Sequence, residues 1–188
     1  LRYSTLIGGS GEDEAKHRNH VQSDGSLILG GEFQSPAVAG ASGGREGPAS
    51  GWVGKLNTGG SFDLLRYLGG NGWDRVVDRA ADAAGRIYAV GSTTSSNFPV
   101  TAGAIQTTYG GSQDGFFVIL DQSGAILYAT YLGGSGLETL RGVEVGPDGS
   151  VYLVGGTQSS NFPVTGGAYQ TTRGGDQDGF AIRLSVSP

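Results

Sequence analysis

A block of 22 residues occurs twice in this chain, and this repeat constrains the fold more than any other feature. Residues 95–116 (SSNFPVTAGAIQTTYGGSQDGF) and 159–180 (SSNFPVTGGAYQTTRGGDQDGF) agree at 18 of 22 positions and begin 64 residues apart. A more divergent copy lies upstream, where Pro36 matches Pro99 and Gly51-Trp52 match Gly115-Phe116. Self-similarity at a fixed period is typical of repeated supersecondary units, so the chain is predicted to be a tandem repeat.

Short apolar runs separated by turn residues predict β-strands throughout the chain, with no helical periodicity. Each repeat has a polar first strand, an apolar second strand after a turn such as Asp24-Gly25, and a third strand after a long loop, which contains NFPVT in repeats two and three. In repeats one and two a fourth strand follows and ends in Gly-Gly. Asp-Gly between two strands is a hairpin signal and predicts a type I′ turn. The predicted strands are 15–22, 26–30, 51–56, 64–70, 75–82, 86–91, 115–120, 127–134, 140–146, 151–155 and 179–184, with a lone leading strand at 1–9.

Four short strands per repeat in up-and-down order predict an all-β, β-propeller-like fold. We expect a single domain over 1–188 with three four-stranded blades of about 62–64 residues: a leading outer strand (1–9), repeat one (10–70), repeat two (71–134) and repeat three (135–188). Propellers commonly have at least about four blades, so we expect the ring to be closed or extended through neighbouring copies.

Composition narrows the functional classes. The net charge is −5 and Lys16 and Lys55 are the only lysines, so no basic stripe favours a nucleic-acid partner. No apolar run has the ~20 residues that a membrane-spanning helix needs. The chain has 37 glycines, no cysteine and no methionine, even at position 1. We interpret it as a processed or excised segment of a protein at the cell surface or outside the cell.

The combination of YLGGSG (131–136), PDGSVYLVGGT (147–157), NFPVT-GA-Q (161–170) and GG-QDGF (174–180) resembles the SBBP-type β-propeller repeats of large bacterial and archaeal surface proteins. Repeat one departs most, because it lacks NFPVT and carries a different loop at 43–50. The resemblance covers nearly the whole chain. It implies a propeller-like blade, an extracellular location and a structural or adhesive role, and it supplies no catalytic residues.

Candidate ligand sites are weak. Recurrence of NFPVT in successive repeats favours a packing role, with Phe98 and Phe162 between blades and the loop glutamine satisfying backbone groups. Asp114 and Asp178 are predicted to cap turns. Asp176-x-Asp178 resembles the start of a calcium loop but lacks the terminal acid, so calcium is only an alternative and no cofactor is expected.

The first strands carry most of the polar differences between repeats. They contain His17, Arg18 and His20, then Arg75, Asp78 and Arg79, then Arg141 and Glu144. Two histidines are too few for a zinc site, so we predict polar, partly solvated strands. The acids Glu12, Asp13, Asp74, Glu138 and Glu144 mostly occupy repeated turn positions, which disfavours a glycosidase pair. No catalytic residue is predicted, and the chain is expected not to be an enzyme.

The two ends of the chain carry the leading functional hypothesis. The first strand has no blade of its own and the third repeat stops after its third strand, and an unpaired edge can pair with another chain. We predict self-association by strand complementation into a ring or a head-to-tail filament, through Leu1, Tyr3, Thr5 and Ile7 against Phe180, Ile182 and Leu184. Two alternatives remain open: a carbohydrate-binding or adhesive module with Trp73 and Tyr109 as contacts to surface glycans, or a fragment of a longer propeller.

Overall fold

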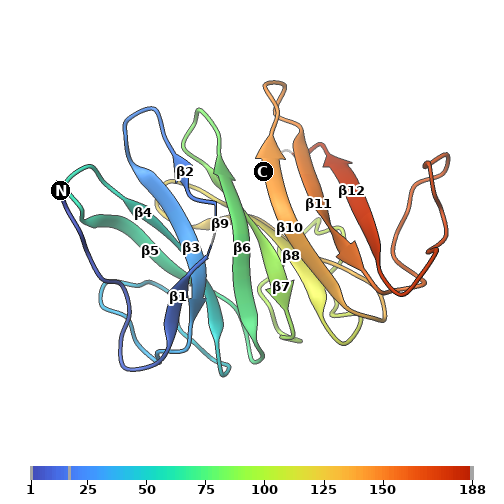
Figure 1. The fold of residues 1–188 in the computed structure, drawn as a ribbon, viewed down its shortest axis with the longest axis horizontal. Helices are drawn as coiled ribbons and strands as arrows, with labels where there is room; N and C mark the ends of the chain where they lie inside the picture. The colour runs from blue at the N-terminus through green and yellow to red at the C-terminus, as the bar shows by residue number, and fades with distance from the viewer. Residues whose placement is uncertain (1, 17, 187–188) are drawn as a thin grey trace.

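The computed structural model describes residues 2–16 and 18–186, which form three antiparallel β-sheets side by side (Figure 1). The first sheet contains β1 (Asp13–Ala15), β2 (His20–Val21), β3 (Leu27–Phe33), β4 (Ser50–Leu56) and β5 (Phe62–Leu68). The second contains β6 (Asp74–Ala81), β7 (Ile87–Thr93), β8 (Asp114–Leu120) and β9 (Ile126–Leu132). The third contains β10 (Glu138–Val145), β11 (Val151–Thr157) and β12 (Asp178–Leu184). The predicted all-β class is therefore confirmed, and none of these sheets closes into a barrel.

From β3 to β5, from β6 to β9 and from β10 to β12, each strand pairs with the next strand along the chain, as in successive β-hairpins. In the second sheet β7 and β8 pair from Ile87↔Leu120 to Thr93↔Asp114. In the third sheet β11 and β12 pair in the corresponding register, from Val151↔Leu184 to Thr157↔Asp178. The second sheet continues to β9, whereas the described part of the third sheet ends at β12.

The hairpin turns differ from the prediction. Gly25 has φ +81° and its N–H bonds to the Gln22 carbonyl at 2.9 Å, but Arg18 is the only non-glycine with positive φ in the described chain. Asp24 therefore lacks the positive φ that a type I′ turn needs. The geometry is that of a three-residue hairpin in which only the glycine adopts the left-handed conformation. The Asp24 carboxylate instead accepts a hydrogen bond from the Ser26 N–H at 2.8 Å.

The predicted leading strand is not paired within the single chain. Residues 2–9 have no strand partner in the described structure, so their pairing with another copy stays a prediction. Leu1 lies outside the described residues. The predicted first strand of repeat one is split into β1 and β2, which both pair with β3.

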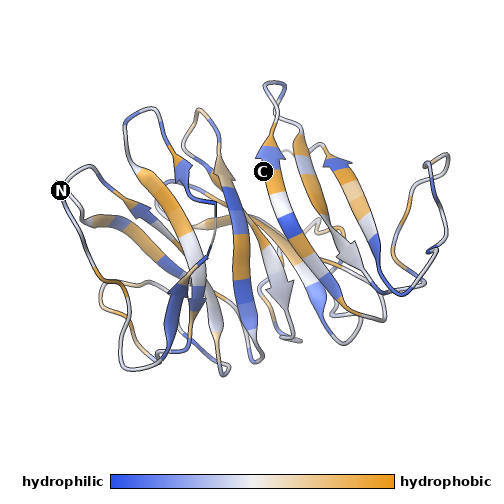
Figure 2. Ribbon diagram, in the orientation of Figure 1, coloured by the Kyte–Doolittle hydropathy of each residue, from blue (hydrophilic) through white to orange (hydrophobic). Residues whose placement is uncertain are grey.

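The hydrophobic core lies largely between successive sheets. One face of β7 carries Tyr88 and Val90, which are buried against Val151 and Leu153 of β11. The opposite face of β7 carries Ile87 and Ala89, which are buried with residues of the first sheet such as Ile28. Both faces of the middle sheet are thus covered, and Figure 2 shows apolar residues along the strands of the sheets. The outward face of the third sheet is not covered: Tyr152 and Val154 are 43% and 48% exposed.

Asp78 and Arg79 on β6 are buried, which corrects the expectation of a partly solvated first strand for these two residues, whereas Arg141 and Glu144 on β10 are exposed. Arg79 donates hydrogen bonds to the carbonyls of Gly30 and Lys16 in the first sheet, at 3.1 and 2.8 Å. Burial lowers the pKa of Arg79 to about 10, despite the nearby Asp78. Asp78 accepts the Val143 N–H of β10 at 3.0 Å. These two side chains therefore tie the middle sheet to both neighbours.

Gly91 shows why β3, β7 and β11 each have a glycine at their fifth residue. A β-carbon at Gly91 would lie 1.8 Å from the Arg75 carbonyl oxygen of the neighbouring strand. The register of β6 and β7 shifts between Val76 and Asp78, close to this contact. The close approach of two backbones leaves no space for a side chain.

We predict that Gly91→Ala lowers the free energy of unfolding by about 1–3 kcal/mol, because the added methyl group forces two strands apart. Gly44→Ala is the matched control, since a β-carbon there has nothing within 4 Å. Urea denaturation of both variants measures the difference. Equal stability of the two variants would contradict the packing described for Gly91.

Candidate functional site

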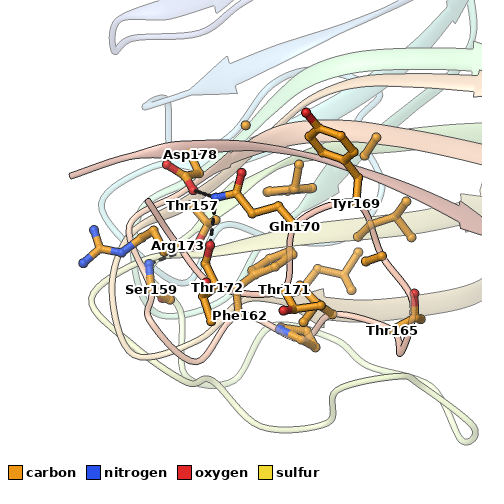
Figure 3. Close-up of a pocket in the computed structure, with 18 of the residues that line it drawn as sticks. Thr157, Ser159, Phe162, Thr165, Tyr169, Gln170, Thr171, Thr172, Arg173 and Asp178 are labelled. Carbon is orange, nitrogen blue, oxygen red and sulfur yellow. Dashed lines mark hydrogen bonds between the residues drawn. The ribbon is translucent and has the colours of Figure 1, made fainter. Parts of the chain in front are cut away.

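The candidate site is a groove of about 850 Å³ along the outer edge of β12 (Figure 3). One wall is β12 itself, including the predicted contact residues Phe180, Ile182 and Leu184. The other wall is the loop between β11 and β12, which contains the second copy of NFPVT. Leu132 of β9 and Ile105 also line the groove.

The second sheet shows what such a loop does when its sheet has a fourth strand. The loop between β7 and β8 wraps around β9 and forms hydrogen bonds with it. Thr101 donates its N–H to the Ala129 carbonyl at 3.0 Å and accepts the Ala129 N–H through Oγ1 at 3.0 Å. Gln106 donates its N–H to Thr130 Oγ1 at 2.9 Å and accepts the Gly133 N–H through Oε1 at 2.9 Å.

The loop of the third sheet keeps its internal contacts. Gln170 Nε2 donates to Asp178 Oδ2 and to the Thr172 carbonyl, at 2.8 and 2.7 Å, as dashed lines show in Figure 3. The corresponding Gln106 Nε2 donates to Asp114 and to Thr108, both at 2.8 Å. This agreement shows that the loop holds its shape without a strand inside it.

The phenylalanine that β9 covers in one loop is less buried in the other. Phe98 is 2% exposed and stacks on Phe116 with ring centroids 4.6 Å apart. Phe162 stacks on Phe180 at 4.4 Å but is only partly buried. Tyr169 is fully exposed, whereas its counterpart Ile105 is 52% exposed. The groove therefore has the lining that surrounds β9 in the second sheet.

A tyrosine hydroxyl is the most buried polar contact between β9 and its loop. Tyr131 OH accepts the Phe98 N–H at 2.9 Å and donates to the Ser95 carbonyl at 2.8 Å. Burial raises the pKa of Tyr131 to about 12, so this hydroxyl keeps its proton. In the first sheet Tyr67 OH donates to the Ser35 carbonyl at 3.3 Å. Sequence reasoning missed this role, although the repeated Tyr-Leu-Gly-Gly of 67–70 and 131–134 was the available signal.

We predict that Tyr131→Phe lowers the free energy of unfolding by about 1–3 kcal/mol, because the buried Phe98 N–H and Ser95 carbonyl both lose their partner. Tyr169→Phe is the control, because the Tyr169 side chain is fully exposed. Thermal and urea denaturation compare the two. A Tyr131→Phe variant as stable as Tyr169→Phe would contradict the assigned role.

The N-terminal segment contacts the first sheet in the same way as β5 contacts the second sheet and β9 contacts the third sheet. In each case the second glycine of a Gly-Gly pair donates its N–H to an acid four residues later. The bonds are Gly9 to Asp13 Oδ2 at 2.8 Å, Gly70 to Asp74 Oδ2 at 2.8 Å, and Gly134 to Glu138 Oε2 at 2.7 Å. A serine hydroxyl donates to each acid and accepts the N–H two residues after the Gly-Gly pair: Ser35 from Gly11, Ser95 from Gly72 and Ser159 from Gly136.

A second contact supports this correspondence. The predicted contact residue Tyr3 lies over the turn between β4 and β5, where a β-carbon at Gly60 would be 2.9 Å from Tyr3 Cγ. In the next turn a β-carbon at Gly124 would be 2.5 Å from Leu64 Cδ1 on β5. Tyr3 and Leu64 are equivalent, because each lies five residues before the first glycine of the following Gly-Gly pair. Residues 2–9 therefore lie where the fourth strand of a preceding sheet would lie.

Asp13 and Asp74 occupy equivalent positions, but their pKa values shift in opposite directions because they are buried to different extents. Burial alone would raise the pKa of Asp13, but hydrogen bonds from the Ser35 hydroxyl and from the Gly9 and Ser35 amides hold it below its usual value. At Asp74, burial outweighs similar hydrogen bonds and raises the pKa. The difference arises because Asp74 lies between two sheets, whereas Asp13 is only half-buried.

We predict that the Gly9 amide signal titrates with a midpoint below the ordinary aspartate pKa of 3.8. A folded-state pKa that is lowered stabilises the docked segment above pH 3.8, and this stabilisation is lost as the pH falls through the folded pKa. The Gly70 amide, which reports on Asp74, should titrate above 3.8. NMR titration measures both midpoints, and a reversed order would contradict the two environments.

The structure also shows the surroundings of the acids and of one of the two histidines that were singled out from the sequence. Asp114 and Asp178 accept the Gly110 and Gly174 amides at 2.9 and 2.8 Å, so the turn-capping prediction is confirmed. His17 lies outside the described residues, and His20 pairs with Ile28 in β3. Over residues 2–16 and 18–186, no three His, Cys, Asp or Glu side chains group together to hold a metal ion.

Trp73 and Tyr109 have different surroundings. The Trp73 side chain is 49% exposed, and its backbone bridges Ala49 and bonds to Thr94. Tyr109 is partly buried and packs on Tyr131 with centroids 6.0 Å apart. Tyr109 therefore helps to enclose β9, whereas Trp73 remains available to solvent.

Comparison with known proteins gives no family for this chain: no family model and no curated protein matches it. Within the described residues, no helix has the length and apolar character needed to cross a membrane.

Proposed function

We propose that this chain is a non-enzymatic, extracellular structural module that self-associates by strand complementation. Residues 1–7 of one copy pair with β12 of a second copy and become the fourth strand of its third sheet. The proposal rests on the match between a groove and a segment. The groove beside β12 is lined by the loop that corresponds to the loop around β9, and the N-terminal segment makes the contacts of a fourth strand with the sheet that follows it.

The pairing has a defined register. On the pattern of β8 and β9, where Phe117 is opposite Thr130 and Val118 is opposite Ala129, Thr5 comes opposite Ala181 and Ser4 comes opposite Ile182. Main-chain hydrogen bonds then supply affinity, and alternate side chains supply specificity, as in other cases of strand addition. Tyr3 and Thr5 match Tyr128 and Thr130 of β9.

The geometry of the joint favours a continued propeller. The Gly9–Asp13 contact is equivalent to the Gly70–Asp74 contact between the first and second sheets. The third sheet of the second copy, completed by residues 1–7, would therefore pack on the first sheet of the first copy as one sheet packs on the next within the chain. This packing also covers Tyr152 and Val154 of β11. The equivalent residues of β7, Tyr88 and Val90, face the third sheet and are 3% and 0% exposed. Two copies give a six-bladed ring if the rotation closes, and a head-to-tail filament if it does not.

The resemblance to SBBP-type repeats of surface proteins, together with a composition lacking cysteine and methionine, supports an extracellular or cell-surface location. An adhesive, carbohydrate-binding role is a second candidate only for the exposed Trp73, since Tyr109 is engaged with Tyr131. Loss of glycan-array binding in Trp73→Ala would support it, and an array without binding by the parent chain would discard it.

We predict that Thr5→Cys/Ala181→Cys forms disulfide-linked dimers or larger species under oxidising conditions, because opposed residues in antiparallel strands have Cα atoms about 4.5–5.5 Å apart. The chain has no native cysteine to interfere. Leu6→Cys/Ala181→Cys is the matched control, because neighbouring residues on a strand point to opposite faces. Non-reducing electrophoresis and sedimentation velocity measure the products.

Association without cross-linking in the Thr5/Ala181 variant would overturn the proposed pairing. A cross-link within a single chain would show instead that the N-terminal strand closes on its own third sheet. Deleting residues 1–9 should leave the chain monomeric or unfolded, and an unchanged assembly in that variant would equally contradict the proposal.

A further inference from the structure

We infer that the groove beside β12 selects its strand by side-chain hydroxyl groups, and that a tyrosine two residues before the first glycine of Gly-Gly is the main determinant. The strand that the groove prefers therefore has the form Tyr-x-Thr-Tyr-x-Gly-Gly, which the N-terminal strand of a second copy matches except at Leu6. The inference deepens the proposed function and rests on it for the identity of the donor strand, whereas the preference of the groove stands on the lining alone.

The first determinant is read from the bonds of Tyr131. Its hydroxyl bridges the Phe98 N–H and the Ser95 carbonyl in the second sheet. The equivalent groups of the third sheet belong to Phe162 and Ser159. Ser159 is only 2% exposed and is fixed by its hydroxyl bond to Glu138 at 2.6 Å. A tyrosine hydroxyl entering the groove at this position therefore meets an acceptor and a donor already held in place.

The second and third determinants come from the loop end. In the second sheet the Ile105 N–H donates to Tyr128 OH at 3.2 Å, and the Gln106 N–H donates to Thr130 Oγ1 at 2.9 Å. Their counterparts are the amides of Tyr169 and Gln170, which have no protein partner in the described structure. The tight bonds of Gln170 to Asp178 and Thr172 keep these amides on the groove wall.

The N-terminal segment satisfies two of the three determinants. Tyr3 and Thr5 correspond to Tyr128 and Thr130, but Leu6 stands where β5 and β9 have Tyr67 and Tyr131. Leu6 cannot donate to the Ser159 carbonyl or accept from the Phe162 amide. Both groups would then lose water without gaining a partner, which weakens binding. The native strand is thus a moderate ligand, and Leu6 limits its affinity.

Leu6→Tyr tests this directly in the full-length chain. Leu6 is 99% exposed, so the substitution should leave the folded single chain unchanged. Leu6→Phe is the matched control, because it adds the same ring without the hydroxyl group. We expect Leu6→Tyr to self-associate about fivefold or more tightly than Leu6→Phe, as one buried hydroxyl bond implies. Equal association of the two variants in sedimentation equilibrium would overturn the hydroxyl preference.

Peptides separate this inference from the proposed function. A fluorescent peptide LYATYLGG, the sequence of residues 127–134, should bind the wild-type chain. LYATFLGG, which lacks the hydroxyl group that Tyr131 provides, should bind about fivefold or more weakly. Binding should shift the NMR signals of the Phe162 and Tyr169 amides. Equal affinity of the two peptides, or no binding of either, would overturn the inference.

One combination of results divides the two claims. If the wild-type chain remains monomeric but binds LYATYLGG in preference to LYATFLGG, the groove has the inferred selectivity and the proposed donor is wrong. If the chain self-associates in the Thr5/Ala181 register but Leu6→Tyr and Leu6→Phe associate equally, the donor is right and the hydroxyl preference is wrong.

Discussion

The structure depends on the outer edge of each sheet having a strand and a loop to cover it. In the second sheet β9 is the edge strand, because it pairs with β8. The loop between β7 and β8 covers β9 through the hydrogen bonds that Thr101 and Gln106 form with it. A sheet edge without a partner exposes main-chain groups that readily pair with another strand. The described third sheet has the loop and the open edge of β12, and this edge is where we propose that a strand of another copy binds.

Carboxylates set the spacing between sheets. Asp74 and Glu138 each receive the amide of a Gly-Gly pair and a serine hydroxyl, so the end of one sheet is fastened to the start of the next. Asp13 likewise accepts hydrogen bonds from the Gly9 N–H and the Ser35 hydroxyl, although no sheet precedes it in the described structure. In the proposed assembly this contact forms the joint to the added sheet, and its presence in the single chain lowers the ordering cost of association.

The sequence predicts the strands well because alternation, glycine turns and the 64-residue repeat are local signals. It fails where contacts are not local. The hairpins need positive φ only at glycines such as Gly25, and β6 buries Asp78 and Arg79 because they bond to neighbouring sheets. The groove could be anticipated from the missing fourth strand, but the role of Tyr131 depends on a loop that lies more than 30 residues away in the chain.

The most direct test of strand complementation is amide hydrogen exchange of β12 and residues 2–7 at increasing protein concentration. The account predicts that both segments become protected together, over the same concentration range in which the sedimenting mass rises. A rise in mass while β12 and residues 2–7 continue to exchange as in the dilute monomer would contradict it.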